Sequence, residues 1–258
     1  MKWLGGVMLA AWLAGCAVQP GDPAGGGVSQ STGDSEARQR AQTFTDLAAA
    51  YYLRAQYKVA LDELRKAITT DSRFGPAYNV YGLIYMELAE DRLAEENFRR
   101  AIELDRNDSV SRTNYGWFLC TRGRHDAGLE QFAAALRNPL YAQPELAMSN
   151  AGQCAEMKGD LALAEAHLER SLKLQPDSPT TLLRLAALRF RQGGLVEAQR
   201  LLARHDALVP PSAESLWLGV RVERRLGDRA QEGAYGLQLR KRFPDSVEAR
   251  LLQAGQYE

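Results

Sequence analysis

Large and small apolar residues recur at three- and four-residue spacing from about residue 41 onward, and polar residues fill most positions between them. This period is typical of amphipathic helices. In the stretch 75–108 the pattern occurs twice, and the residues that carry it are Tyr78, Tyr81, Gly82 and Tyr85, followed by Ala94, Phe98 and Ala101. The stretch is therefore expected to form two helices that pack against each other.

The same pattern returns at a fixed distance along the chain. Pro176, Pro210 and Pro244 are separated by intervals of 34 residues, which is the period of tetratricopeptide (TPR) repeats. Aligning the chain on these prolines gives six repeats, at about 41–74, 75–108, 109–142, 145–178, 179–212 and 213–246. The sequence thus predicts an all-α fold, a superhelical solenoid of TPR repeats in a domain that spans residues 41–258.

Small residues at fixed places explain how the paired helices could lie close together. At the eighth and twentieth positions of a repeat they allow its two helices to approach. The tight turn between the helices is expected at a row of glycines, Gly123, Gly159, Gly193 and Gly227. Residues 247–258, with Leu251 and Leu252 on one face, are expected to form a short helix that caps the last repeat. Repeats three and four are offset by 36 residues, and Pro139 and Pro144 predict a kink or a longer loop there.

The N-terminal residues have a different pattern, in which Lys2 precedes an apolar run, residues 3–13. We interpret residues 1–15 as a secretory signal peptide, because the run is too short to span a bilayer as a helix. Its end, Leu-Ala-Gly-Cys, resembles the lipobox of bacterial lipoproteins, which implies cleavage before Cys16 and attachment of lipid to its thiol. The alternative is a plain secretory signal with a chance cysteine near the cleavage site. Ala17, where an inner-membrane retention signal would place Asp, favours export to the outer membrane.

The segment between the signal peptide and the first repeat is rich in Gly, Pro, Ser and Asp. Residues 16–40 also lack an apolar period, and such a composition is typical of a flexible tether. We expect this tether to hold the folded body near the membrane without placing it in contact with lipid.

The composition excludes some functions and supports none by itself. Equal numbers of basic and acidic residues, 32 of each, leave no net charge that would attract nucleic acid. The histidines, His125, His167 and His205, lie in three different repeats without ligands at metal-binding spacing. The sequence contains no phosphate-binding glycine loop and no nucleophile elbow. We therefore expect a protein that is not an enzyme, with no metal, no cofactor besides the lipid on Cys16, no nucleic acid and no small-molecule substrate.

Cys120 and Cys154 remain once Cys16 is assigned to lipid. An exported chain meets an oxidising compartment, in which disulfides form. The two residues fall at positions twelve and ten of adjacent first helices, so their Cα atoms could lie near or beyond the ~7 Å limit for a disulfide. We favour two buried or groove-lining thiols over a bridge, which remains the alternative.

In a stack of TPR repeats, the first helices line a concave groove. The predicted groove residues are Tyr52, Asn79, Leu83, Met86, Thr113, Trp117, Leu146, Leu183, Phe190, Trp217 and Arg221, and Leu53 and Met157 fall at the same positions. The N-terminal half of this groove is apolar with a few amides, and its last turn is basic. Apolar anchors in a groove suit an amphipathic helix or an extended segment of a partner protein. The alternative is that each side chain simply packs against a neighbouring helix.

Several stretches are more specific than the general repeat pattern. They are residues 114–120 (Asn-Tyr-Gly-Trp-Phe-Leu-Cys), 150–152 (Asn-Ala-Gly), 214–221 (Glu-Ser-Leu-Trp-Leu-Gly-Val-Arg) and 235–240 (Tyr-Gly-Leu-Gln-Leu-Arg), with Phe-Pro at 243–244. Together with the order of lipobox, tether, repeats and final helix, these stretches resemble the type IV pilus biogenesis lipoproteins, the PilF/PilW pilotin family.

The resemblance implies an outer-membrane lipoprotein that faces the periplasm. It also implies a partner, the secretin subunit of the type IV pilus, which such a pilotin escorts to the outer membrane and helps to assemble into a multimeric pore. Two other classes of exported TPR lipoprotein would have the same fold and remain alternatives. One is a periplasmic scaffold that links outer-membrane machinery to cell-wall enzymes, and the other is an accessory factor for barrel insertion.

Overall fold

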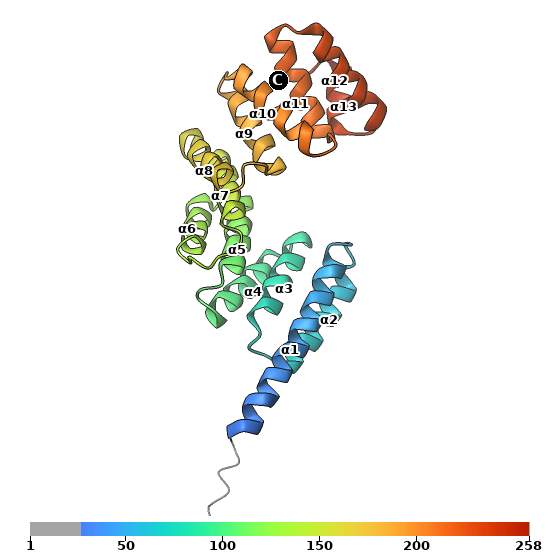
Figure 1. Cartoon of the computed structure of the whole chain (residues 1–258). Helices are drawn as coiled ribbons and strands as arrows, with labels where there is room; N and C mark the ends of the chain where they lie inside the picture. Colours follow the sequence, from blue (N-terminus) through green and yellow to red (C-terminus); the bar gives the residue numbers. More distant parts are fainter. Residues whose placement is uncertain (1–26, 258) are drawn as a thin grey trace, which may run out of the picture.

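The computed structural model describes residues 27–257, and within this range the chain forms helices and no strands (Figure 1). The all-α fold that the sequence predicts is confirmed. The helices are α1 (Gly27–Tyr52), α2 (Tyr57–Thr70), α3 (Gly75–Glu87), α4 (Asp91–Leu104), α5 (Ser109–Thr121), α6 (His125–Ala135), α7 (Pro144–Lys158), α8 (Leu161–Leu174), α9 (Pro179–Arg191), α10 (Leu195–Leu208), α11 (Ala213–Leu226), α12 (Arg229–Arg242) and α13 (Val247–Ala254).

The helices pack as consecutive pairs, from α1 with α2 to α11 with α12, and α13 lies against the last pair. From α3 onward the first helix of each pair begins within one residue of the start of a predicted repeat. The odd-numbered helices α1, α3, α5 and α7 lie side by side. The backbones of α7, α9 and α11 are more widely separated, and Figure 1 shows the array changing direction between α8 and α9.

A glycine in the first helix of a repeat lets the second helix come close. A Cβ atom added to Gly82 would lie 2.6 Å from ring atoms of Phe98 on α4. The same arrangement recurs at Gly116, Gly152 and Gly219. Protein interiors are close-packed, so a larger residue at these positions would push the two helices apart. This contact is the physical reason for the small residues at the eighth position of repeats two to four, and in the sixth repeat it is made by Gly219, one position earlier.

The turn between the helices of a repeat needs a residue with positive φ. Glycine meets this need in the last four repeats, at Gly123, Gly159, Gly193 and Gly227, with φ from 75° to 91°. In the first two repeats the equivalent residues are Ala55 and Ala89, with φ of 56° and 57°. The left-handed conformation costs a residue with a Cβ atom about 1–2 kcal/mol. The N-terminal repeats therefore contain local backbone strain.

The segment 16–40, which we expected to be a flexible tether, is partly helical. Helix α1 begins at Gly27, so the prediction was wrong for residues 27–40. Good helix formers fill the end of this stretch, and the guanidinium of Arg38 lies 5.5 Å from the ring centre of Phe74. In the sequence alone, the run of three glycines at 25–27 favours a flexible segment over a helix. The signal peptide, Cys16 and the rest of the tether lie outside the described residues.

The irregular spacing between repeats three and four corresponds to a loop, residues 136–143, between α6 and α7. In this loop the amide of Asn138 donates to the carbonyl of Asn107 at 3.1 Å. The predicted capping helix is present as α13, where Leu251 and Leu252 pack against buried residues of α11 and α12. Both irregular regions predicted from the sequence are therefore observed.

Cys120 of α5 and Cys154 of α7 form a disulfide, with their Cα atoms 5.5 Å apart. The preference for two free thiols was wrong. Helices α5 and α7 lie side by side, and small residues around the bridge, among them Gly128 and Ala151, leave room for the sulfur atoms. Positions ten and twelve of adjacent helices therefore come within bonding range.

None of the helices within residues 27–257 is both long enough and apolar enough to span a membrane.

We predict that Ala89→Gly stabilises the protein by about 0.5–1 kcal/mol. The substitution removes the left-handed strain, and part of this gain is offset by the greater freedom of glycine in the unfolded chain. Urea denaturation followed by circular dichroism measures the change. As a control, Ala50→Gly at an exposed helical position is expected to cost up to about 1 kcal/mol. Equal destabilisation by both substitutions would contradict the prediction.

We predict that reduction of the disulfide destabilises the array by about 2–4 kcal/mol, because the bridge closes a loop in the unfolded chain. The measurement is urea denaturation with and without reductant. The double variant Cys120→Ala/Cys154→Ala is the control, and its denaturation curve is expected not to respond to reductant. Two titratable thiols in denatured, unreduced protein without Cys16 would show that the bridge does not form.

Candidate protein-binding face

The first helices of neighbouring repeats share one surface of the array. We term it the first-helix face, and it consists of the side chains of α1, α3, α5, α7, α9 and α11 at the predicted groove positions. On this face Asn114 of α5 donates from Nδ2 to Oδ1 of Asn79 on α3, at 3.0 Å. The hydroxyl of Tyr52 on α1 donates to Oε1 of Glu87 on α3, at 3.5 Å. Each of these hydrogen bonds thus joins a predicted groove residue to the first helix of the next repeat.

The predicted groove residues differ in how much of each side chain is accessible. Leu146 is 44% exposed. Those that are half-buried are Tyr52, Leu83, Met86, Trp117, Leu183 and Arg221. Those that are buried are Asn79, Thr113, Phe190 and Trp217. For these last four the alternative interpretation holds in this structure, because internal contacts cover each of them.

Thr113 illustrates this internal use of polar groove positions. Its side chain is 2% exposed, its hydroxyl donates to the carbonyl of Ser109 at 2.8 Å, and it lies 3.1 Å from the hydroxyl of Tyr141. On α7, Ser149 and Asn150 accept hydrogen bonds from the guanidinium of Arg184 on α9, at 2.8 and 3.2 Å. The polar side chains in the middle of the face therefore hold adjacent repeats together.

Apolar side chains remain exposed on the N-terminal part of the face. We term them the apolar anchors, and they are Leu53, Val110, Leu146 and Met157. Leu53, in the turn directly after α1, is 83% exposed. Exposed apolar groups that recur on one surface are typical of protein-interaction sites. Val110 was missed in the sequence, although it occupies the same second position of its repeat as Leu146.

Between the anchors lie apolar residues that also belong to the core. Leu83 and Met86 pack against the cluster that contains Phe98 and Phe118. Trp117 packs against the next cluster, around the disulfide. These three side chains therefore contribute to both surface and core, and removing them would lower stability as well as binding.

An open cleft of about 1050 Å³ lies at the start of α3 and α5. Its walls come from the helical extension of α1, the turns before α3 and α5, and the first turns of those helices. The carboxylates along it have structural roles: Asp71 and Asp105 accept from backbone N–H groups two residues on, and Asp108 caps α5. The sequence does not reveal this cleft, because the composition of residues 16–40 predicts a tether where α1 extends.

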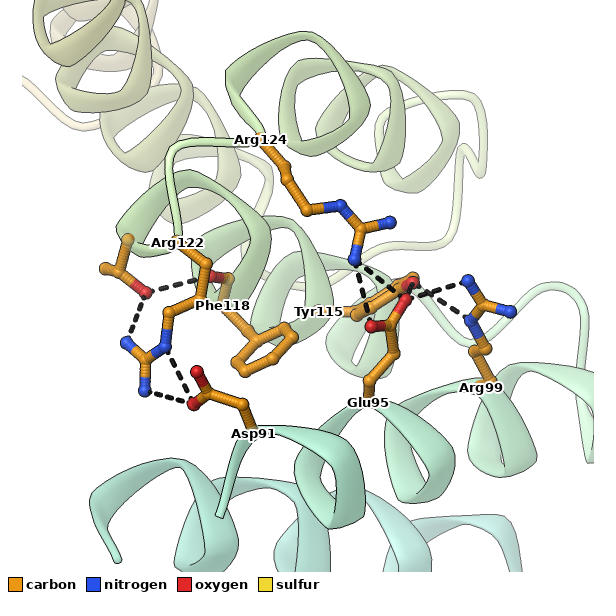
Figure 2. Close-up of polar contacts among 8 residues, drawn as sticks. Asp91, Glu95, Arg99, Tyr115, Phe118, Arg122 and Arg124 are labelled. Carbon is orange, nitrogen blue, oxygen red and sulfur yellow. Dashed lines mark hydrogen bonds and ion pairs between the residues drawn. The ribbon is translucent and has the colours of Figure 1, made fainter. Parts of the chain in front are cut away.

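A cluster of charged side chains fixes repeat two against repeat three (Figure 2). Glu95 on α4 accepts a hydrogen bond from the hydroxyl of Tyr115 on α5 at 2.8 Å. It also accepts from Arg124 at 2.9 Å through both carboxylate oxygens and from Arg99 at 2.7 Å. Since the cluster joins α4 to α5 and to the start of α6, it sets the angle between the repeats that carry Leu83 and Trp117.

A second contact of the same kind lies beside it. Arg122, after α5, donates to Asp91 at the start of α4 at 2.8 Å. The guanidinium also lies 5.3 Å from the ring centre of Phe118 and donates to the carbonyl of Met86 at 3.4 Å. Hydrogen bonding to Arg122 holds the pKa of Asp91 below its usual range. The last turn of α3, which carries Met86, is thus tied directly to α5.

Glu95 is ionised in this setting. Burial alone would raise its pKa, but the hydrogen bonds from Tyr115 and Arg124 and the charges of Arg124 and Arg99 outweigh burial and lower the pKa below its ordinary value of 4.5. The carboxylate is therefore charged at neutral pH, when all three of these contacts can form.

Comparison with known proteins places this repeat array in a family. Models of the tetratricopeptide repeat match residues 75–108 and 156–217. The type IV pilus assembly protein PilF of Pseudomonas aeruginosa is 28% identical over 247 residues, which cover 96% of each chain. The crystal structure of PilW, described as a widely conserved type IV pilus biogenesis factor, has a TM-score of 0.76 and 32% identity, and the match covers 83% of this chain and 98% of that one. The chain belongs to the PilF/PilW family.

The structure of P. aeruginosa PilF supports this placement, with a TM-score of 0.75 and 28% identity over 87% of this chain and all of that one. The chain is accordingly a TPR protein of the kind that acts in type IV pilus biogenesis. Within residues 27–257 the structure contains no group of three or more His, Cys, Asp or Glu side chains that could hold a metal ion.

For this PilF/PilW-type chain we predict that Glu95→Gln lowers the free energy of unfolding by about 1–2 kcal/mol at pH 7. Because the folded pKa is depressed, the contribution of Glu95 is complete above pH 4.5 and is lost as the pH falls through the folded pKa. The difference between variant and wild type is therefore expected to shrink below pH 4.5.

The measurement is urea denaturation over a series of pH values. Glu103→Gln is the matched control, since Glu103 forms only an exposed ion pair with Arg100 and is expected to change stability by less than about 1 kcal/mol. A difference for Glu95→Gln that stays constant down to about pH 3 would show that the charge is not responsible.

Proposed function

We propose that this chain is a pilotin, an outer-membrane lipoprotein that binds secretin subunits of the type IV pilus and promotes their localisation and assembly into multimers. The observation that carries this proposal is the similarity to PilF, which extends over 96% of both chains. It is supported by the N-terminal sequence, in which Cys16 ends a lipobox-like motif.

The lipid and the repeat array would have different roles in this function. Lipid on Cys16 would hold the protein at the periplasmic side of the outer membrane, since several acyl chains are needed for stable attachment. The first-helix face would hold the secretin subunit. Confining both proteins to one membrane raises their effective concentration, which favours assembly without any chemical step.

The apolar anchors are the part of the face best suited to the secretin. Leu53 and Leu146 are exposed and leave the core clusters intact, whereas the more buried predicted residues hold the repeats together. Burial of one exposed leucine against a partner contributes about 1.5–3 kcal/mol, so two anchors are sufficient to change the affinity at least tenfold.

We predict that Cys16→Ala yields a folded protein but few secretin multimers in the outer membrane, because the chain loses its attachment. We also predict that Leu53→Ser with Leu146→Ser weakens secretin binding at least tenfold with little change in stability. The measurements are gel electrophoresis of isolated outer membranes from the native bacterium, and titration of the purified chain with secretin subunits.

Leu237→Ser is the matched control, since Leu237 is an exposed leucine on α12 and lies outside the first-helix face. It is expected to leave binding unchanged. Normal secretin multimers in the Cys16→Ala strain would contradict the proposed role of the lipid in targeting the secretin to the outer membrane. Purification of the chain with cell-wall synthases or barrel-insertion proteins in place of secretin would favour a periplasmic scaffold.

A further inference from the structure

The residues after α13 fold back onto the first-helix face of the last repeat. The chain turns at Gly255, with a φ of 67°, and the backbone N–H of Gln256 donates to the carbonyl of Leu251 at 3.0 Å. This turn places the ring of Tyr257 against Trp217 of α11, with ring centres 5.7 Å apart and planes inclined by 23°. Trp217 is 7% exposed.

Two arginines of α11 complete the contact with Tyr257. The guanidinium of Arg224 lies 3.9 Å from the centre of the tyrosine ring, which is within the range of a cation–π interaction. Nε of Arg221 donates to the backbone carbonyl of Tyr257 at 3.0 Å. An aromatic side chain and one backbone group are thus both recognised, which is the way a groove holds an extended peptide.

Arginines of α11 also contact α9. Arg221 and Arg225 lie 4.5 and 5.1 Å from the ring centre of Phe190. Arg224 forms an ion pair with Glu232 at 2.8 Å, but among residues 27–257 neither Arg221 nor Arg225 has a carboxylate within ion-pair distance. Burial and the neighbouring charge of Arg225 lower the pKa of Arg221. Two cations side by side favour a negatively charged ligand.

We infer that Phe190, Trp217, Arg221, Arg224 and Arg225 form a second binding site, for an extended segment of a partner protein that presents an aromatic residue next to a carboxylate. In the free protein the chain's own Tyr257 occupies this site as a displaceable strap. The sequence of the strap has the expected chemistry, because Glu258 follows Tyr257. The position of Glu258 lies outside the described residues.

Displacement requires little structural change. Leu251 and Leu252 hold α13 on the array, and only Gly255 and Gln256 separate that helix from Tyr257. Tyr257 itself is only half-buried. A short connection gives the strap an effective concentration on the order of millimolar. A strap whose own intrinsic dissociation constant is about 0.1 mM would therefore weaken a competing ligand about tenfold.

The test uses a labelled, amidated peptide with the sequence of residues 252–258 as the probe. The protein is the mature chain shortened to end at Gln256, which keeps the hydrogen bonds that close α13. We expect this shortened chain to bind the peptide at least tenfold more tightly than the intact chain, and the fluorescence of Trp217 to change on binding. The peptide with alanine in place of tyrosine is expected to bind at least tenfold more weakly.

Matched variants separate the site from general stability. In the shortened chain, Arg221→Ala is expected to lose at least tenfold in peptide affinity, while Arg250→Ala, at an exposed arginine of α13, is expected to change nothing. If the shortened chain does not fold, full-length Tyr257→Ala replaces it. Failure of the peptide to bind the folded variant, or equal binding to the intact chain, would overturn the inference. No secretin is involved, so the result is independent of the proposed pilotin role.

Discussion

The structure depends on the close approach of the two helices in each repeat. Gly82 lies so near Phe98 that no side chain fits between them, and Gly219 has the same relation to Tyr235. The contact fixes which face of each first helix is buried. The opposite face is then left for contacts with other molecules or with the next repeat, so the first-helix face follows from this one constraint.

This constraint also explains why the fold could be predicted from the sequence. Each glycine–ring contact joins residues 16 apart, and the positive-φ turn residue, Ala89 or a glycine, lies between them, so the pattern repeats locally and can be read from one chain. Predictions failed where contacts between repeats decide the outcome. The extension of α1 rests on Arg38 against Phe74, and the disulfide depends on how closely α5 and α7 pack. Neither the contact of Arg38 with Phe74 nor the distance between α5 and α7 can be derived from the spacing of residues along the sequence.

The candidate site was predicted less well than the fold for a related reason. Repeat alignment places Trp117 and Trp217 at similar faces, but it cannot show what covers a side chain. Trp217 is covered by Tyr257, which lies 40 residues further along the chain, and Phe190 lies beneath two arginines of the next repeat. Leu53 and Leu146 do remain exposed on this structure, and their role in binding stays a prediction.

The two ends of the first-helix face differ in the contacts that hold them. From α1 to α7 neighbouring helices are joined by backbone packing, by the Glu95 cluster and by the disulfide. Between α7 and α9 the backbones separate, and side chains fill the junction. They are a buried apolar cluster that includes Ala155, Leu168 and Leu182, the hydrogen bonds from Arg184, and an ion pair between Arg191 and Glu156. The first-helix face therefore has two parts: backbones lie against each other from α1 to α7, whereas from α7 to α9 interdigitated side chains set the distance between the first helices.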